Sequence, residues 1–366
     1  MSPRSKQREA LLAWFDRHRR DLPWRRDRDP YRVWISEIML QQTRVETVIP
    51  YYERFLERFP SVERLAAANL DEVLSSWSGL GYYRRARQLY AAAQEIVLRG
   101  SFPRTLESLR TLPGIGAYTA AAIASIAFDV VEPVMDGNVE RVISRLLLEA
   151  GDVKSAAVRK RLVTAAAELV DAGRPGDSNQ ALMELGATVC LPRIPRCLLC
   201  PVVDGCLASG NEPERFPSPR RERAREERSG LAVLVEEGGR MLLFRRPDES
   251  SLLAGLWELP WLEEVDESPE GALAARYGGG WKLGSKLGQV RHGITFRDLS
   301  IEVRRGELSN AGELAESRAE AGWFRHEELG SLALPSLTTK LLAAARANTE
   351  GTDARRTRSG RSRPRG

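Results

Sequence analysis

The sequence predicts two folded domains, a mainly α-helical one followed by a smaller α+β one, on three observations. Apolar residues recur at intervals of three and four from Gln7 to about Leu207, which is the period of amphipathic helices. Beyond Ser229 the apolar period changes to two, as in strands with one buried face. Between them, residues 211–229 contain three prolines and many alternating charges, so we expect an exposed linker there.

The individual elements follow from the same spacing. In the first half, short breaks rich in glycine and proline separate many of the helical segments, which we expect at residues 8–19, 61–69, 71–77, 84–97, 106–111, 117–128 and 139–148. In the second half, the apolar stretches 231–235 and 241–244 flank Glu236-Glu237-Gly238-Gly239-Arg240, which predicts a β-hairpin. Residues 299–303 are a further strand candidate, and residues 338–347 a closing helix.

Composition and charge narrow the class of protein. A chain of 366 residues with 42% hydrophobic and 29% charged residues is typical of a soluble globular protein with two or three domains. Its net charge of +5 fits a polyanionic partner without specifying one. Most of the excess lies near the C-terminus, where residues 350–366 carry six arginines against Glu350 and Asp353. We expect residues 346–366 to form a disordered basic tail that attracts phosphates non-specifically.

Neither a signal peptide nor a membrane span is expected. The first twenty residues are densely charged and lack an apolar core segment. Pro113, Gly114 and Gly116 interrupt the longest uncharged stretch, which is then too short to cross a bilayer. We therefore expect a cytoplasmic protein of bacterial type, and we expect it to be a monomer. In a reducing compartment, clustered cysteines indicate metal ligation or catalysis before disulfides.

All four cysteines fall in one short segment with the spacing C-x6-C-x2-C-x5-C: Cys190, Cys197, Cys200 and Cys206. Four thiolates so close together can surround either a zinc ion or an iron–sulfur cluster, and the spacing alone does not choose between them. It does predict a loop-rich cap at the end of the helical domain that needs its metal to fold.

The segment Leu112-Pro113-Gly114-Ile115-Gly116 lies between two expected helices. Two glycines two positions apart permit a tight hairpin whose backbone N–H groups face outward ahead of a helix N-terminus, a natural seat for a phosphate. Taken alone, such a turn is also a common connector between helices.

Glu37 is a candidate general acid. On a helix its neighbours at three and four residues are Val33, Trp34, Leu40 and Gln41, so its carboxyl group should be desolvated and its pKa raised. The alternative is a glutamate that points to solvent from a helix end.

Asp136 is the candidate second carboxylate. It either begins the helix that follows as an N-cap, or stays ionised to stabilise a cationic transition state. One carboxylic acid and one carboxylate are the equipment that glycoside hydrolysis uses.

Taken together, the Leu-Pro-Gly-Ile-Gly hairpin, the aspartate about twenty residues later and the cysteine spacing resemble the helix–hairpin–helix DNA glycosylase superfamily. Members with this spacing carry a 4Fe–4S cluster, so the resemblance implies one here. The runs 22–24 (Leu-Pro-Trp), 34–43 (Trp-Ile-Ser-Glu-Ile-Met-Leu-Gln-Gln-Thr) and 79–83 (Gly-Leu-Gly-Tyr-Tyr) resemble the adenine-specific MutY branch. The match covers nearly all of residues 8–206.

The resemblance implies a role for each matched residue. Glu37 would protonate adenine at N7 and Asp136 would stabilise the cationic sugar, with Tyr118 and Asn138 shaping that pocket. The residues expected to line the adenine pocket are Trp24, Arg25, Leu40 and Gln180. Those expected to enter or flank the duplex are Gln42, Thr43, Leu80 and Tyr82, and Gly114 and Gly116 would hold a DNA phosphate.

Position 118 separates two branches of the superfamily. Endonuclease III-like members place there a lysine that forms a Schiff base with the sugar, whereas this chain has Tyr118. Without that amine, the resemblance implies a monofunctional glycosylase with little or no lyase activity.

Residues 230–345 resemble the Nudix-like domain that recognises 8-oxoguanine opposite adenine, through the runs 255–260 (Gly-Leu-Trp-Glu-Leu-Pro) and 290–292 (Val-Arg-His). The metal-binding box of Nudix hydrolases is lacking from the sequence, so we expect no pyrophosphate hydrolysis. Many members carry a Phe-Ser-His loop against 8-oxoguanine where this chain has Ile294-Thr295-Phe296. We expect Thr295 to contact the base, and we expect either weaker discrimination of 8-oxoguanine from guanine or help from another residue.

The sequence therefore predicts a helix–hairpin–helix glycosylase domain at 1–210 with a cluster loop at 190–206, a linker at 211–229, a Nudix-like domain at 230–345 and the tail at 346–366. The expected activity is DNA base-excision repair, with release of adenine from double-stranded DNA opposite 8-oxoguanine or guanine. An endonuclease III-like glycosylase/lyase and a non-catalytic mismatch-binding protein remain as alternatives.

Overall fold

The computed structural model describes residues 3–218, 224–250, 252–264, 268–294, 296–310, 314 and 320–359. The chain divides into two compact units. The helical unit comprises Met1–Ala67 and Gln88–Arg221, and the sheet unit comprises Ala68–Arg87 and Glu222–Gly366. The sheet unit thus includes twenty residues, 68–87, that we had placed in the helical domain from the sequence. No helix in the described part of the chain is long and apolar enough to cross a membrane.

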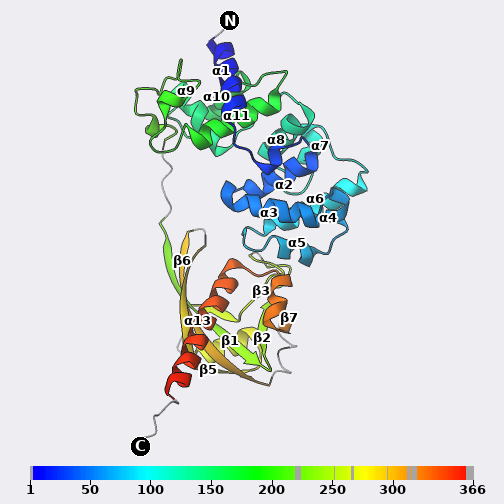
Figure 1. Ribbon diagram of the computed structural model, residues 1–366, viewed down its shortest axis with the longest axis vertical. Coiled ribbons are helices and arrows are strands. Elements are labelled where there is room, and N and C mark those ends of the chain that lie inside the picture. Colours follow the sequence, from blue (N-terminus) through cyan, green and yellow to red (C-terminus); the bar gives the residue numbers. More distant parts are fainter. Residues whose placement is uncertain are drawn as a thin grey trace, which may run out of the picture. The chain divides into compact units, whose positions relative to one another are not determined.

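Helices make up the helical unit (Figure 1). Their bounds are α1 Pro3–His18, η1 Pro23–Arg25, α2 Pro30–Leu40, α3 Val45–Arg58, α4 Val62–Ala66, α7 Leu106–Arg110, α8 Ala117–Phe128, α9 Gly137–Leu147, α10 Ala156–Ala167, α11 Pro175–Thr188, η2 Cys197–Leu199 and η3 Pro213–Arg215. Helices α1, α4, α7, α8 and α9 lie in segments whose apolar spacing predicted a helix, whereas α3, α10 and α11 were not among those segments. Helix α6, Arg84–Leu98, begins in the sheet unit and ends in the helical unit.

Helix α2 is buried along nearly its whole length. It begins at Pro30, and the Asp29 side chain accepts hydrogen bonds from the backbone N–H groups of Tyr31 and Arg32 as its N-cap. Helices α3 and α8 pack against it, and α11 packs against α1, α8 and α9. Burial on all sides explains why Glu37 has so little contact with water.

Small residues let these helices approach closely. A Cβ atom at Gly186 on α11 would lie 2.6 Å from the Cβ atom of Asn138, and one at Gly176 would lie 2.7 Å from the carbonyl oxygen of Ser125. Both separations are too short for a real side chain, so these glycines set the distance from α11 to α9 and α8. The Gly186 contact lies beside the first turn of α9, which also carries Asp136 as its N-cap.

Within the residues described, the sheet unit holds one mixed sheet in the order β3-β2-β1-β6-β5, with β4 paired to β1 and β7 paired to β2. The strands are β1 Glu226–Glu237, β2 Arg240–Arg245, β3 Trp257–Glu258, β4 Trp261–Glu263, β5 Gly280–Ile294, β6 Arg297–Ser309 and β7 Glu320–Phe324. Strands β1 and β6 pair in parallel, and the other pairs are antiparallel. The unit also contains α5 Leu70–Ser76, α12 Pro269–Tyr277, η5 His326–Ser331 and α13 Ser336–Ser359.

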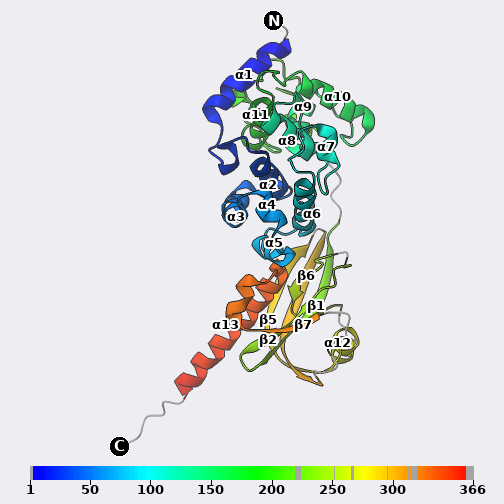
Figure 2. The ribbon, with the colours of Figure 1, turned by 90° about the vertical axis from the view of Figure 1, so that its right-hand side faces the viewer.

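Alternation along β1 gives the sheet two buried faces. Ala232 and Leu234 join the apolar cluster that α13 covers, whereas Leu231, Val233 and Val235 join the one that α12 covers. Figure 2 shows α13 along the sheet and α12 at its other side. The predicted hairpin is confirmed, because β1 pairs with β2 across Gly238 and Gly239, both with positive φ. Helix α13 continues to Ser359, beyond Ala347 where we expected the closing helix to end.

Candidate active site and cysteine pocket

The candidate general acid is buried as predicted. Glu37 is 5% exposed, and its Oε2 accepts a 2.6 Å hydrogen bond from the Tyr118 hydroxyl on α8. Burial raises the pKa of Glu37 to about 7, and the negative charge of Asp136 adds to this. The Tyr118 hydrogen bond and the positive charge of Arg25 act in the opposite direction on the same pKa. The carboxyl group is therefore close to half protonated at neutral pH, which suits a proton donor.

Asp136 is the N-cap of the helix that follows it, which is one of the two roles that the sequence left open. It is the N-cap of α9, with Oδ1 accepting from the Val139 backbone N–H at 2.7 Å and Oδ2 accepting from Asn138 Nδ2 at 3.1 Å. Burial raises the pKa of Asp136, while these hydrogen bonds and the charge of Arg141 lower it. Burial is the larger effect, so the pKa of Asp136 lies above its usual value, and the N-cap hydrogen bonds limit that rise.

Asn138 connects Asp136 to the cysteine loop through Arg141, a residue that the sequence did not single out. Arg141 Nη2 donates to Asn138 Oδ1 at 2.8 Å and to the Gly186 carbonyl at 2.8 Å, and its Nε donates to the Cys190 carbonyl at 2.8 Å. The available signal was the pair of arginines, Arg141 and Arg145, spaced one helical turn apart ahead of the cysteines.

The four residues expected in the adenine pocket come from three elements. Trp24 in η1 is 8% exposed and packs edge-on against Tyr52, with ring centroids 5.4 Å apart. Arg25 acts electrostatically on Glu37 and lies next in the chain. Leu40 ends α2, and Gln180 lies on α11, both half-buried. Helix α2, which ends at Leu40, packs against η1, which carries Trp24 and Arg25.

Glu184 is a further residue that the sequence did not indicate. Its side chain is fully buried, with Oε2 accepting from Arg25 Nη2 at 2.8 Å and Oε1 accepting from Arg20 Nε at 2.7 Å. Burial favours the neutral acid, but the two arginines outweigh it and hold the pKa of Glu184 below its usual range. Glu184 therefore fixes the guanidinium group of Arg25.

The four residues expected to meet the duplex divide between the two units. Gln42 and Thr43 follow α2 in the helical unit, and Leu80 and Tyr82 lie between α5 and α6 in the sheet unit. Gln42 and Tyr82 are exposed, and each has a left-handed backbone, with φ of 56° and 51°. Such conformations are uncommon for residues with side chains and cluster at functional sites. Leu80 is buried, with 6% exposure.

The predicted hairpin is present between α7 and α8. The Ile115 N–H donates to the Leu112 carbonyl at 3.2 Å, Gly114 has φ of 75°, and Gly116 is the N-cap of α8. A Cβ atom at Gly114 would lie 2.7 Å from that of Gln88, so glycine is required there for space as well as for conformation. Both glycines are exposed, which leaves the N-terminus of α8 open to an anion.

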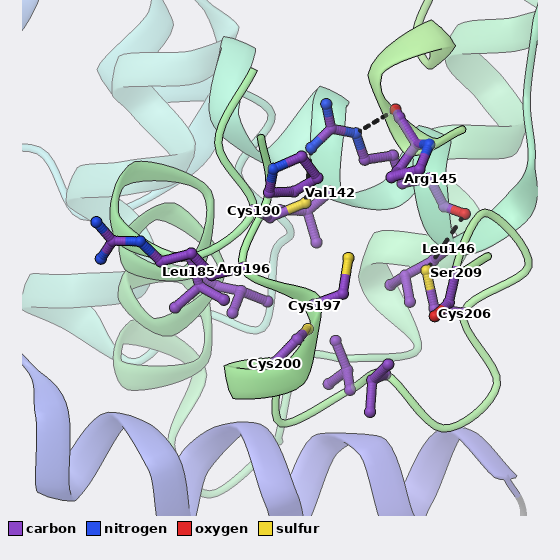
Figure 3. Close-up of a pocket in the computed structure, with 15 residues that line it drawn as sticks. Val142, Arg145, Leu146, Leu185, Cys190, Arg196, Cys197, Cys200, Cys206 and Ser209 are labelled. Carbon is purple, nitrogen blue, oxygen red and sulfur yellow. Dashed lines mark hydrogen bonds between the residues drawn. The ribbon is translucent and has the colours of Figure 1, made fainter. Parts of the chain in front are cut away.

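The four cysteines line one pocket, shown in Figure 3 with Val142, Leu146 and Arg145 around it. Arg145 Nη1 donates to Cys190 Sγ at 3.3 Å, and the same side chain donates to the carbonyls of Leu191 and Pro192. Burial raises the pKa of Cys200 to about 12 and that of Cys206 above its usual value. Burial thus disfavours the thiolate form of these two side chains.

Within the described residues, no three or more His, Cys, Asp or Glu side chains are grouped closely enough to hold one metal ion. Thr295, expected to contact 8-oxoguanine, lies outside the described residues. Its neighbours Ile294 and Arg297 end β5 and begin β6. His292 on β5 lies 3.3 Å from Lys340 Nζ, and burial together with that charge lowers the pKa of His292.

Comparison with known proteins agrees with this geometry. Residues 35–167 match the family model of the HhH-GPD superfamily base excision DNA repair proteins, and residues 230–344 match that of the NUDIX domain. The chain is 38% identical to the adenine DNA glycosylase of Homo sapiens over 94% of this chain and 75% of the human protein. It is 42% identical to that of Arabidopsis thaliana over 72% of this chain and 49% of the plant protein.

The chain belongs to the adenine DNA glycosylase family. The predicted membership, fold class and base-excision repair glycosylase function are thereby confirmed. Among solved structures, a thermostable thymine-DNA glycosylase aligns with a TM-score of 0.51 and 31% identity, over 56% of this chain and 95% of that chain. That relative is named for a different base, so the helical fold alone does not determine which base is the substrate.

The raised pKa of Glu37 has a consequence for stability. Between its usual value of 4.5 and about 7, the native protein binds a proton that the unfolded chain releases, so the free energy of unfolding falls as pH rises. Above pH 7 the free energy of unfolding is lower by about 3 kcal/mol than at acidic pH. We expect Glu37→Gln to stabilise the protein at pH 8 but not at pH 4.5, as measured by urea unfolding. Glu57→Gln, at an exposed site on α3, is the control. A benefit of Glu37→Gln that is equal at both pH values would contradict the expectation.

Proposed function

We propose that this glycosylase releases adenine from double-stranded DNA in which the base is mispaired with 8-oxoguanine or guanine, and that it works as a cytoplasmic monomer. The observation that carries the proposal is the pairing of Glu37, buried with a pKa of about 7, with the hydrogen-bonded carboxylate of Asp136. The similarity to adenine DNA glycosylases over 94% of the chain supports adenine as the base.

The chemistry follows from the two carboxyl groups. Glu37 donates its proton to N7 of the flipped adenine, so that the base leaves as a neutral species with the electrons of the glycosidic bond. Asp136 stabilises the positive charge left on the sugar, and water then attacks the anomeric carbon. Tyr118 orients the Glu37 carboxyl through its 2.6 Å hydrogen bond, and Asn138 orients Asp136.

Extruding the adenine requires groups that bind it and groups that replace it in the stack. We assign the adenine pocket to Trp24, Arg25, Leu40 and Gln180. The groups that enter or flank the duplex are Gln42, Thr43, Leu80 and Tyr82, of which Gln42 and Tyr82 are exposed with strained backbones. Gly114 and Gly116 would bind a phosphate at the N-terminus of α8.

Tyr118 also supports a monofunctional reaction. A Schiff base with the sugar needs an amine, and a phenol cannot provide one. Burial and the nearby carboxylates raise the pKa of Tyr118 well above its usual value, which keeps the hydroxyl protonated as a donor to Glu37. We therefore propose that strand cleavage does not accompany base release.

The decisive measurement is single-turnover base release from an A:8-oxoguanine duplex, with and without hot alkali. We expect the wild type to yield alkali-labile sites at the adenine and Glu37→Gln to be slower by at least about 100-fold. Glu57→Gln should match the wild type. Strand breaks without alkali, or a borohydride-trapped protein–DNA adduct, would favour a glycosylase/lyase. Mismatch binding without base release would favour a non-catalytic protein.

Preference for 8-oxoguanine should depend on position 296. The family loop carries a histidine where this chain has Phe296, so we expect only a modest ratio of rates on A:8-oxoguanine and A:G duplexes. Phe296→His should raise that ratio by adding a hydrogen-bonding group beside Thr295. A very large preference in the wild type that Phe296→His leaves unchanged would contradict this.

We further propose that the cysteine pocket holds one 4Fe–4S cluster on Cys190, Cys197, Cys200 and Cys206. All four side chains line a single apolar pocket, and Arg145 donates a hydrogen bond to the sulfur of Cys190, as suits a negatively charged thiolate. When bound, the group cross-links the loop 190–206, whose folding it stabilises.

Protein purified without oxygen should contain iron and sulfide in equal amounts and absorb visible light. Cys200→Ser should lose the iron and lower the melting temperature, because the loop then lacks its cross-link. Ser209→Ala, which alters the same pocket without removing a thiol, should keep the iron. Stoichiometric zinc in place of iron would contradict the assignment.

A further inference from the structure

The loop 79–83 that presents Tyr82 is held in an unusual conformation. Gly79, Gly81 and Tyr82 have φ values of 99°, 72° and 51°. Glycine adopts such angles freely, but a tyrosine does so only where neighbouring contacts hold it. Tyr82 is nevertheless 50% exposed, so its own ring supplies little of that support. The contacts that fix the loop must come from the residues on either side of it.

Two of those contacts come from the helices that flank the loop. Trp77 Nε1 donates to the Gly81 carbonyl at 3.1 Å. Arg85 Nη2 donates to the carbonyls of Gly81 at 3.2 Å and Leu80 at 3.4 Å, and its guanidinium group lies 5.4 Å from the Trp77 ring and 5.5 Å from the Tyr82 ring. Trp77 and Arg85 therefore hold the loop by its backbone at Leu80 and Gly81.

The C-terminal part of the sheet unit binds the chain at the two ends of the loop. The Tyr83 hydroxyl donates to the Leu334 carbonyl at 2.7 Å, and Ser78 Oγ donates to the same oxygen at 2.9 Å. The Tyr83 hydroxyl also accepts from the Gly79 backbone N–H at 3.4 Å. The Leu334 carbonyl, which lies between η5 and α13, therefore binds Ser78, just before the loop, and Tyr83, the last residue of the loop. The adjacent Ala333 carbonyl accepts from the Trp257 N–H at 2.9 Å, which ties this segment to β3.

Ion pairs anchor the same segment to the sheet further out. Arg87 Nη2 donates to Asp248 Oδ1 and to the Ala254 carbonyl, each at 2.8 Å, and Arg245 Nη2 donates to Asp71 Oδ1 at 3.3 Å. Residues 68–87 thus belong to the sheet unit by specific bonds as well as by packing. These outer pairs are partly exposed and fix the segment as a whole, whereas the Tyr83 bond is buried at the loop itself.

We propose that Ser78, Tyr83 and the Leu334 carbonyl form a clamp through which the Nudix-like domain holds the loop 79–83 in the form that exposes Tyr82 for entry into the duplex. Ser78 and Tyr83 are then positioning residues that act through Tyr82. The proposal rests on the function proposed above. It implies that the domain assigned to recognition of the opposing purine also sets the side chain that enters the stack beside it.

The test removes both hydroxyls in the full chain, with Ser78→Ala and Tyr83→Phe combined, because either donor alone can still hold the carbonyl. A first measurement needs no DNA: amide hydrogen exchange of residues 80–82, leaving out Gly79, whose N–H loses its own acceptor with the Tyr83 hydroxyl. We expect exchange to speed up about fivefold, because the loss of one hydrogen bond makes local opening of the loop more frequent. Unchanged exchange would overturn the clamp, whatever the enzyme does.

The second measurement is a double-mutant cycle with Tyr82→Ala, read as the single-turnover rate of base release. If the clamp acts through Tyr82, the clamp variant and Tyr82→Ala each slow the wild type, but Tyr82→Ala costs little more once the clamp is gone. Additive effects would overturn the positioning role. A wild type that releases no base would instead refute the proposed function, while the exchange measurement still decides on the clamp.

Tyr31→Phe is the matched control. Its hydroxyl is likewise buried and donates to a backbone carbonyl, that of Phe59, at 2.7 Å, but it lies on α2 in the helical unit. It should lower the melting temperature to a similar degree, leave exchange at 80–82 unchanged and combine additively with Tyr82→Ala.

Discussion

The burial of one carboxyl group is the constraint on which the helical unit depends. Glu37 needs an environment dry enough to raise its pKa to about 7, yet with one donor to orient it, and Tyr118 is that donor. The buried helix α2 provides the environment, and α8 supplies Tyr118. Close approach through Gly186 then brings α11 against the first turn of α9, where the Asp136 side chain accepts the Val139 N–H as the N-cap. The packing of these helices therefore also sets the pKa values of Glu37 and Asp136, because burial is the main cause of both shifts.

Much of this could be predicted because local patterns determined it. Apolar spacing gave the helices, two glycines gave the hairpin at 114–116, and the apolar neighbours of Glu37 gave its burial. What could not be predicted depends on partners distant in the chain. Glu184 looks like any helical glutamate until Arg20 and Arg25 meet it across about 160 residues of sequence, a distance that no local period encodes.

The same limit explains the elements that were missed in the sheet unit. Strand β5 has no clear alternation, since its pairing with β6 is interrupted by register shifts between Leu283 and Gly288. Residues 68–87 have a helical pattern, and no local feature separates them from the helical unit. Their assignment to the sheet unit follows from side-chain bonds such as that of Tyr83 to a carbonyl 251 residues away.

Position 145 requires an arginine, because a positive charge alone would not make the hydrogen bonds that its guanidinium group makes. Its guanidinium group donates to the carbonyls of Leu191 and Pro192 and to the Cys190 sulfur on one side, and to the carbonyls of Pro213 and Phe216 on the other. A lysine offers three donors from a single point and cannot reach acceptors spread in this way. One planar group therefore joins the cysteine loop to the start of the linker, and the same group contacts the cysteine sulfur.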